Sequence, residues 1–92
     1  MTLTLDTLLC QHEEALSTEL EGRTVMMSVE HGEYFGTNEL GARLWALLES
    51  PRTVSELCRT LESEYEVEPA TCEADALAFL EDLLRKGLIR LG

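Results

Sequence analysis

The side chains that could do chemistry are few and scattered along the chain. His12 and His31 lie far apart in sequence, and no serine occurs in a GxSxG motif. The cysteines form no CxxC pair, and their odd number suits neither a disulfide framework nor a zinc site; they are Cys10, Cys58 and Cys72. Cys58 and Cys72 fall among helical residues and are expected in the core. We therefore predict a protein that is not an enzyme.

Carboxylates are abundant, but their spacing does not form a metal site. Glutamates alternate along residues 62–68 without the DxDxDG spacing and the glycine of a calcium loop. Glycine-rich loops of the kind that hold phosphate groups are also missing from the sequence. A solvated acidic surface explains these glutamates, and we expect neither a metal ion nor a cofactor.

The net charge restricts the class of partner. The chain has 18 Asp and Glu residues against 7 Lys and Arg residues, giving a net charge of −11. Because nucleic-acid affinity depends on cations that neutralise phosphates, this balance opposes nucleic acid and favours a basic or neutral partner. No apolar run is long enough for a membrane span, and the N-terminus does not resemble a signal peptide. We expect a cytoplasmic protein with no membrane contact.

The first half of the chain has the pattern of a small antiparallel sheet within one domain, residues 1–92. Residues 1–13 are compatible with a loose arm or an extra strand, and residues 15–20 with an irregular strand. Val25, Met27 and Val29 alternate with other residues at a period of two, which predicts a strand with one buried face. His31-Gly32 predicts a tight turn into a third strand over residues 33–36, whose outer edge is expected to be open.

The second half predicts three helices, each with recognisable end signals. Asn38 is a good N-cap for the first helix, and Thr53 with Glu56 forms a capping box for the second. Pro69 suits the first turn of a third helix, which ends with Lys86 before Gly87 in the left-handed conformation. The fold class is therefore α+β: a three-stranded antiparallel sheet followed by three helices, similar to a winged helix-turn-helix.

The third helix has more apolar surface than a small core requires. Cys72, Ala76, Phe79 and Leu83 follow one flank, and further leucines follow the adjoining flank, so the apolar stripe spans roughly 160°. Two explanations stay open at this point. The helix is buried on both flanks, or one flank borders a groove whose other side is the open strand.

The residues from Tyr34 to Trp45, Tyr-Phe-Gly-Thr-Asn-x-x-Gly-Ala-Arg-x-Trp, resemble the PqqD-like family, and so do later positions up to Gly87-Leu88. The resemblance covers about residues 14–91. Thr37 departs from it, since the family usually has Leu before the Asn. The family comprises small proteins of pyrroloquinoline quinone biosynthesis and the recognition elements of ribosomally made, modified peptides (RiPPs). The resemblance implies a single peptide-recognition domain.

The resemblance also implies a function. Family members bind the leader segment of a precursor peptide as a strand added to their third strand, against the third helix. This chain looks most like the separate leader-binding protein of split lasso-peptide systems. Its implied partners are then the leader peptide, a cysteine-protease-like leader peptidase and a cyclase. The residues expected to bind peptide are Val29, Glu30, His31, Glu33, Tyr34, Phe35, Asp75, Ala76, Phe79, Asp82, Leu83 and Lys86.

Three alternatives remain. The first is a peptide chaperone of pyrroloquinoline quinone biosynthesis that acts with a radical S-adenosylmethionine enzyme. The second is a scaffold subunit that does not read the leader. The third, a winged-helix DNA-binding protein, requires a basic recognition helix, whereas residues 70–84 contain only acidic, apolar and small polar side chains. The sequence also leaves open whether Tyr34 or Phe35 faces the core.

Overall fold

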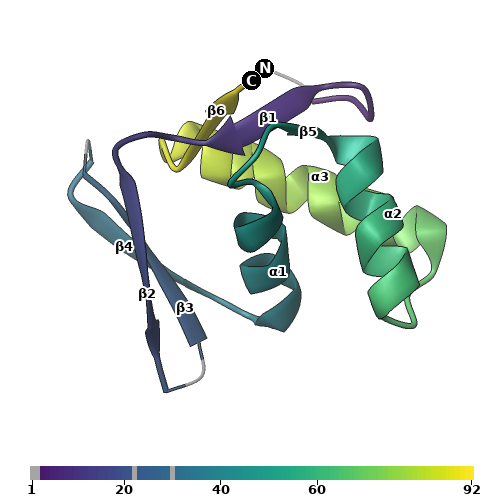
Figure 1. Ribbon diagram of the computed structural model, residues 1–92, viewed down its shortest axis with the longest axis horizontal. Coiled ribbons are helices and arrows are strands. Elements are labelled where there is room, and N and C mark those ends of the chain that lie inside the picture. Colours follow the sequence, from purple (N-terminus) through teal and green to yellow (C-terminus); the bar gives the residue numbers. More distant parts are fainter. Residues whose placement is uncertain (1–2, 22, 30) are drawn as a thin grey trace.

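The structure is a computed structural model that describes residues 3–21, 23–29 and 31–92. It contains three helices and two three-stranded antiparallel sheets, with strand orders β2-β3-β4 and β5-β1-β6. This confirms the α+β class. In Figure 1 the β2–β4 sheet stands on one side of α1, whereas the other sheet lies across one end of the helices. In chain order the elements are β1 (Leu8–Gln11), β2 (Ala15–Leu20), β3 (Arg23–Ser28), β4 (Glu33–Thr37), α1 (Glu39–Leu47), β5 (Arg52–Thr53), α2 (Val54–Glu64), α3 (Pro69–Arg85) and β6 (Ile89–Leu91).

The β2–β4 sheet is the expected antiparallel meander. Met26 of β3 lies opposite Ser17 of β2 and Phe35 of β4. The turn before β4 is built by Ser28, whose carbonyl accepts a hydrogen bond from the Gly32 N–H at 2.7 Å. Gly32 has a φ of +65°, which a residue without a Cβ adopts without steric cost. The predicted turn and third strand are therefore confirmed.

The buried face of β3 is not the one that Val25, Met27 and Val29 share. Met26 and Ser28 are the buried residues of this region, at 1% and 0% exposure, while Val29 is 50% exposed. A serine can replace an apolar residue here because its hydroxyl has a partner, the N–H of His31 at 3.3 Å. The side of β3 that carries Val25 and Met27 therefore faces away from the core.

The helix ends follow the predicted signals. The Asn38 side chain accepts a hydrogen bond from the Gly41 N–H at 2.9 Å, and both halves of the capping box at Thr53 are formed. At the end of α3, Gly87 has a φ of +74°. The N–H groups of Gly87 and Leu88 bond the carbonyls of Leu84 and Leu83, the pair of bonds of a Schellman motif. These signals therefore fix where the helices begin and end.

Residues 3–13 contain an extra strand, one of the two predicted forms, and are not a loose arm; the strand belongs to the second sheet. They contribute β1, which pairs with β5 on one side and β6 on the other. Leu9 and Cys10 in this strand are buried, at 0% and 5% exposure. The Gln11 side chain also donates a 2.7 Å hydrogen bond to the Trp45 carbonyl at the end of α1. The segment is thus an integral part of the domain.

The core lies between the three helices and the β1 sheet. Cys58 and Cys72 are buried between α2 and α3 as small core residues, as predicted. Large side chains that are fully buried come from every layer; they include Leu9, Met26, Leu48, Val54, Leu57, Leu80, Leu88 and Ile89. In the part of the chain that the structure describes, no helix has the length and apolar character needed to cross a membrane.

Candidate binding groove

Strand β4 has an open edge. It pairs with β3 on one side, and within residues 3–21, 23–29 and 31–92 no strand pairs with its other side. The backbone N–H and C=O groups that face outward therefore lack a partner strand, and such an edge accepts an added strand readily. Glu33, Tyr34 and Gly36 are exposed along this strand, while Phe35 and Thr37 are half-buried.

The C-terminal end of α3 is attached to the middle of β4 through Lys86. Its ammonium group lies 4.2 Å from the centroid of the Phe35 ring, a cation–π contact. The same ammonium group lies 2.8 Å from an oxygen of Asp82, and Arg85 pairs with the other oxygen at 2.7 Å. The hydrogen bond from Lys86 keeps the pKa of Asp82 below its ordinary value. Asp82 is thus already neutralised by two cations.

A second contact joins the end of β4 to the middle of α3 through α1. Gly41 is buried in α1, and a Cβ at this position would overlap the Thr37 hydroxyl and lie 2.9 Å from the Phe79 ring. Glycine therefore lets the Phe79 ring and the Thr37 side chain both approach the first turn of α1. The two walls, β4 and α3, are therefore connected at the middle of the open strand and at its C-terminal end.

Beside this junction lies a cleft of about 250 Å³ between α1, α3 and the segment that joins α2 to α3. Its lining is mainly apolar, and among the described residues Asp75 is the only carboxylate in it. Asp75 is exposed and has no ion-pair partner among the described residues. The lining residues are Asn38, Leu40, Gly41, Leu44, Leu61, Val67, Thr71, Cys72, Asp75, Ala76 and Phe79. The cleft can hold an apolar side chain near one negative charge.

The structure brings part of the predicted set of peptide-binding residues together. Phe35, Asp75, Phe79, Asp82 and Lys86 lie along the walls described above, and Glu33 lies on the open strand. His31 and Val29 are exposed in the turn before β4. Glu30 lies outside the described residues.

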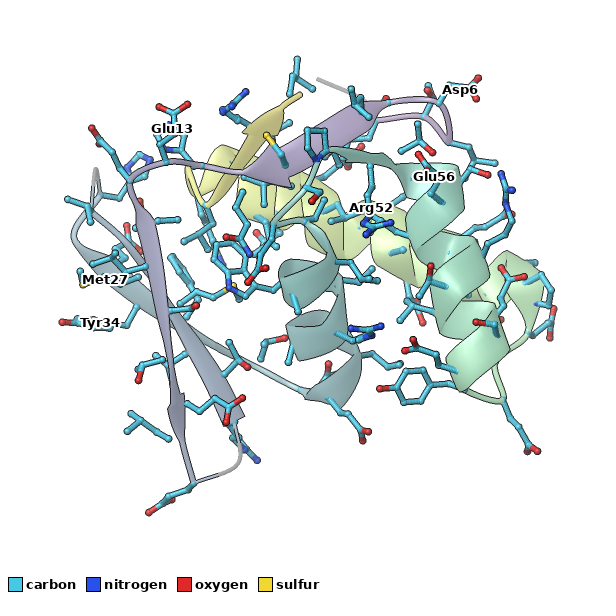
Figure 2. The ribbon with its side chains drawn as sticks, viewed as in Figure 1. Asp6, Glu13, Met27, Tyr34, Arg52 and Glu56 are labelled. Atoms are coloured by element: carbon cyan, nitrogen blue, oxygen red, sulfur yellow. The ribbon has the colours of Figure 1, made fainter. Side chains whose placement is uncertain are left out.

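Three predicted residues do not present side chains to the groove in the expected way. Ala76 and Leu83 are buried, at 3% and 2% exposure, and both belong to the core, although Ala76 also lines the cleft. Tyr34 is 72% exposed, and its side chain points away from the helices (Figure 2). Phe35 is therefore the aromatic residue that packs inward, which answers the question that strand alternation left open.

Sequence reasoning missed the contribution of α1 to this site. Leu40, Gly41 and Leu44 line the cleft, although the predicted set contained only strand and α3 residues. One signal was available, because a glycine inside a helix is costly and usually marks a close approach of another group. Here that group is the Phe79 ring.

Metal-ligand clusters and reactive thiols were sought among the described residues. In this part of the chain no cluster of three or more His, Cys, Asp or Glu side chains could hold a metal ion. Burial raises the pKa of the Cys58 thiol to about 12 and also raises the pKa of Cys72, so both remain neutral thiols. These two cysteines are therefore poor nucleophiles.

The fold and the groove together define a small α+β domain of the winged helix-turn-helix type, with an open strand beside a helix. The chain belongs to the PqqD family: the family model described as Coenzyme PQQ synthesis protein D (PqqD) matches residues 23–89. No curated protein sequence is significantly similar to this chain. The family resemblance predicted from the sequence is confirmed.

Three solved structures are similar in fold. One, described as TbiB1 in complex with the TbiA(beta) leader peptide, is 30% identical, has a TM-score of 0.79 and covers 88% of this chain and 94% of that chain. A lasso peptide synthetase B1 complexed with its leader peptide is 24% identical, with a TM-score of 0.77 over 89% and 96% of the two chains. The PqqD part of Methylobacterium extorquens PqqCD, a stand-alone RiPP recognition element, is 21% identical, with a TM-score of 0.81 over 97% and 95%.

Proposed function

We propose that this protein binds the leader segment of a ribosomally synthesised precursor peptide, of the lasso-peptide type, and delivers it to modifying enzymes. The observation that carries the proposal is the open edge of β4 beside α3 in a chain that is 30% identical to TbiB1, whose structure contains a leader peptide. The leader would add to β4 as a fourth strand. Its backbone would pair with the edge, and its side chains would select the sequence.

The cleft supports this proposal by supplying an anchor site. An apolar leader side chain inserted beside Phe79 would be buried by α1 and α3, and such buried anchors carry most of the energy of an interface. Asp75 at the same cleft would accept a hydrogen bond from a Lys, Arg or Tyr side chain. The net charge of −11 favours a leader that is neutral or basic.

Catalysis would then belong to the partners. We propose that the bound precursor is passed in the cytoplasm to a cysteine-protease-like leader peptidase and then to a cyclase. This division of labour agrees with the buried, neutral thiols of Cys58 and Cys72 and with the lack of a metal-binding cluster among the described residues.

A second function is favoured by the family model, whose description names coenzyme PQQ synthesis. In that case the bound peptide would be the precursor of pyrroloquinoline quinone, and the partner a radical S-adenosylmethionine enzyme. Both functions use the same groove, and they differ in the peptide that binds. Titration with each of the two peptides therefore distinguishes them.

The test is a fluorescence-anisotropy titration with the labelled leader half of a precursor peptide encoded beside this chain. We expect saturable binding at micromolar or lower concentration. Asp75→Arg should weaken it by tenfold or more, on the order of the 1.4 kcal/mol that one charged contact contributes. The matched control is Glu73→Arg, which makes the same charge change two residues earlier, on another side of α3. No binding at hundreds of micromolar, or equal loss in both variants, would contradict the proposal.

A further inference from the structure

Gly36 lies within the open strand β4, although the fold itself gives no reason for a glycine there. Its backbone is not left-handed, because the glycines with positive φ among the described residues are Gly32 and Gly87. A Cβ at Gly36 would meet no described heavy atom within 4 Å, so no close contact excludes a side chain. Neither backbone conformation nor packing within the domain therefore requires this glycine.

A glycine inside a strand weakens that strand, because it loses much conformational entropy on folding and has no side chain to pack. Such a glycine usually marks a bulge, a sharp bend or the close approach of a ligand or another backbone. The pairing of β3 with β4 is continuous, with Val25 opposite Gly36 and Met27 opposite Tyr34, so the strand has no bulge here. The explanation that remains is a group that approaches Gly36 from outside the domain.

The open space over Gly36 has apolar borders. Alternate residues of a strand share a face, so a Cβ at Gly36 would project to the same side as Tyr34, whose side chain points away from the helices (Figure 2). Val25 of β3 lies directly across from Gly36 and is half-buried. We call this space the Gly36 notch, bordered by Tyr34 and Val25. An aromatic ring and an aliphatic side chain as borders fit an apolar group.

We propose that the leader strand lays a large apolar side chain, aromatic or aliphatic, across the Gly36 notch. This inference rests on the proposed function, in which the leader pairs with the open edge of β4. Residues directly opposite on paired strands point to the same face, so the leader residue opposite Gly36 projects over the notch. Glycine lets that side chain lie flat across the backbone and reach Val25. An aromatic side chain packed over a cross-strand glycine stabilises designed sheets in the same way.

The notch adds a spacing rule to leader recognition. The anchor side chain enters the cleft beside Phe79, on the side of β4 that faces the helices. The side chain over Gly36 lies on the other side of the same added strand. Because successive side chains of a strand alternate between its two faces, these two leader positions are an odd number of residues apart. Gly36 is therefore a specificity-determining residue for leaders with two large apolar side chains at odd spacing.

The experiment is a fluorescence-anisotropy titration of the leader half of the precursor with the wild-type chain, Gly36→Ile and Thr18→Ile. Gly36→Ile fills the notch with a branched side chain. Thr18→Ile is the matched control, because Thr18 and Gly36 are both exposed and both pair with Val25, but Thr18 lies on β2 at the far edge. Urea unfolding without leader verifies that both variants fold. A second series uses leaders that carry alanine at each position in turn, so that the wild-type protein also tests the inference.

We expect Gly36→Ile to weaken leader binding by about tenfold or more, because the new side chain occupies the space that the leader side chain needs. The free variant should be at least as stable as the wild type, since isoleucine favours a strand. Thr18→Ile should bind as the wild type does. One alanine-substituted leader should bind the wild type about tenfold more weakly, yet bind Gly36→Ile as well as the unmodified leader does.

Two results would overturn the inference and leave the proposed function in place. The first is a folded Gly36→Ile variant whose leader affinity stays within about twofold of the wild type or increases. The second is an alanine series in which every substitution weakens binding equally to the wild type and to Gly36→Ile. Failure of the leader to bind the wild type at hundreds of micromolar would instead overturn both the inference and the proposed function.

Discussion

The ammonium group of Lys86 lies 4.2 Å from the centroid of the Phe35 ring, and it thereby attaches the end of α3 to the centre of β4. A single side chain is bound on two sides, because Asp82 holds the same ammonium group at 2.8 Å. Phe35 is the inward-packing aromatic residue of the open strand. Lys86 consequently links the two walls of the groove at the centre of the open strand.

Lys86→Met should weaken leader binding and lower the free energy of unfolding by about 0.5–1 kcal/mol, the usual size of a partly exposed cation–π contact. Methionine keeps the apolar stem over Phe35 and removes the charge. The control is Arg85→Met, since Arg85 pairs with the same Asp82 but is 76% exposed and makes no cation–π contact with a described residue. Urea unfolding and leader anisotropy measure both effects. Equal losses in the two variants would show that the contact with Phe35 has no special role.

Gly41→Ala should destabilise the protein by about 1–3 kcal/mol, although alanine is the better helix former. The new Cβ would overlap the Thr37 hydroxyl and press on the Phe79 ring, so leader binding should also weaken. Gly36→Ala is the control, because a Cβ there meets no atom within 4 Å. Its effect should stay within about 0.5 kcal/mol. A stabilised Gly41→Ala variant would contradict the close approach.

The helix ends and the second sheet illustrate what sequence reasoning could and could not predict. Local signals were sufficient for the helices, since the Asn38 cap, the Thr53 capping box and the Gly87 terminus depend on residues a few positions apart. The second sheet could not be predicted, because β5 has only 2 residues and β6 only 3, too few for a periodic pattern. Those strands form through tertiary pairing with β1.

The candidate site was predicted on the strand and on α3 but not on α1. A helical wheel places Ala76 and Leu83 on the same flank as Phe79, yet only a packed structure decides which part of that flank is covered. Two adjacent aromatic residues, Tyr34 and Phe35, likewise fit a strand in either orientation. Alternation gives the period of a strand, and the partner layer decides its face.

Peptide binding at the β4 edge should slow amide hydrogen exchange in residues 33–37. Half of these amides point away from β3 and have no partner strand in the described structure, so they should exchange quickly until the leader supplies acceptors. Residues 24–27 of β3 serve as the control, since β3 is paired on both sides. Two-dimensional NMR with and without leader measures the change. Protection that appears along β2 instead would place the added strand at the opposite edge.

Stability should fall with rising pH in the alkaline range because of Cys58. The thiol is buried and its pKa is raised to about 12, whereas an unfolded thiol titrates near 8.5. Between these values the unfolded state loses the proton first, so its free energy drops relative to the folded state as pH rises. Urea midpoints at pH 7, 9 and 10 measure this trend.

Cys58→Ala is the control for that measurement. It removes the thiol, so the alkaline decline should become smaller although tyrosines and lysines still titrate. The same burial should also protect the native thiols from a disulfide reagent at pH 8, with all three reacting once the chain is unfolded. An alkaline decline of the same size in Cys58→Ala would attribute the effect to other groups.

The pairing of the first strand with the last has a consequence for protein engineering. Leu9 of β1 lies directly opposite Leu91 of β6, so the chain enters and leaves the domain through neighbouring strands about 5 Å apart. A loop of another protein can span such a gap without being stretched. The whole recognition domain can therefore be transplanted as a cassette into a surface loop of a host enzyme.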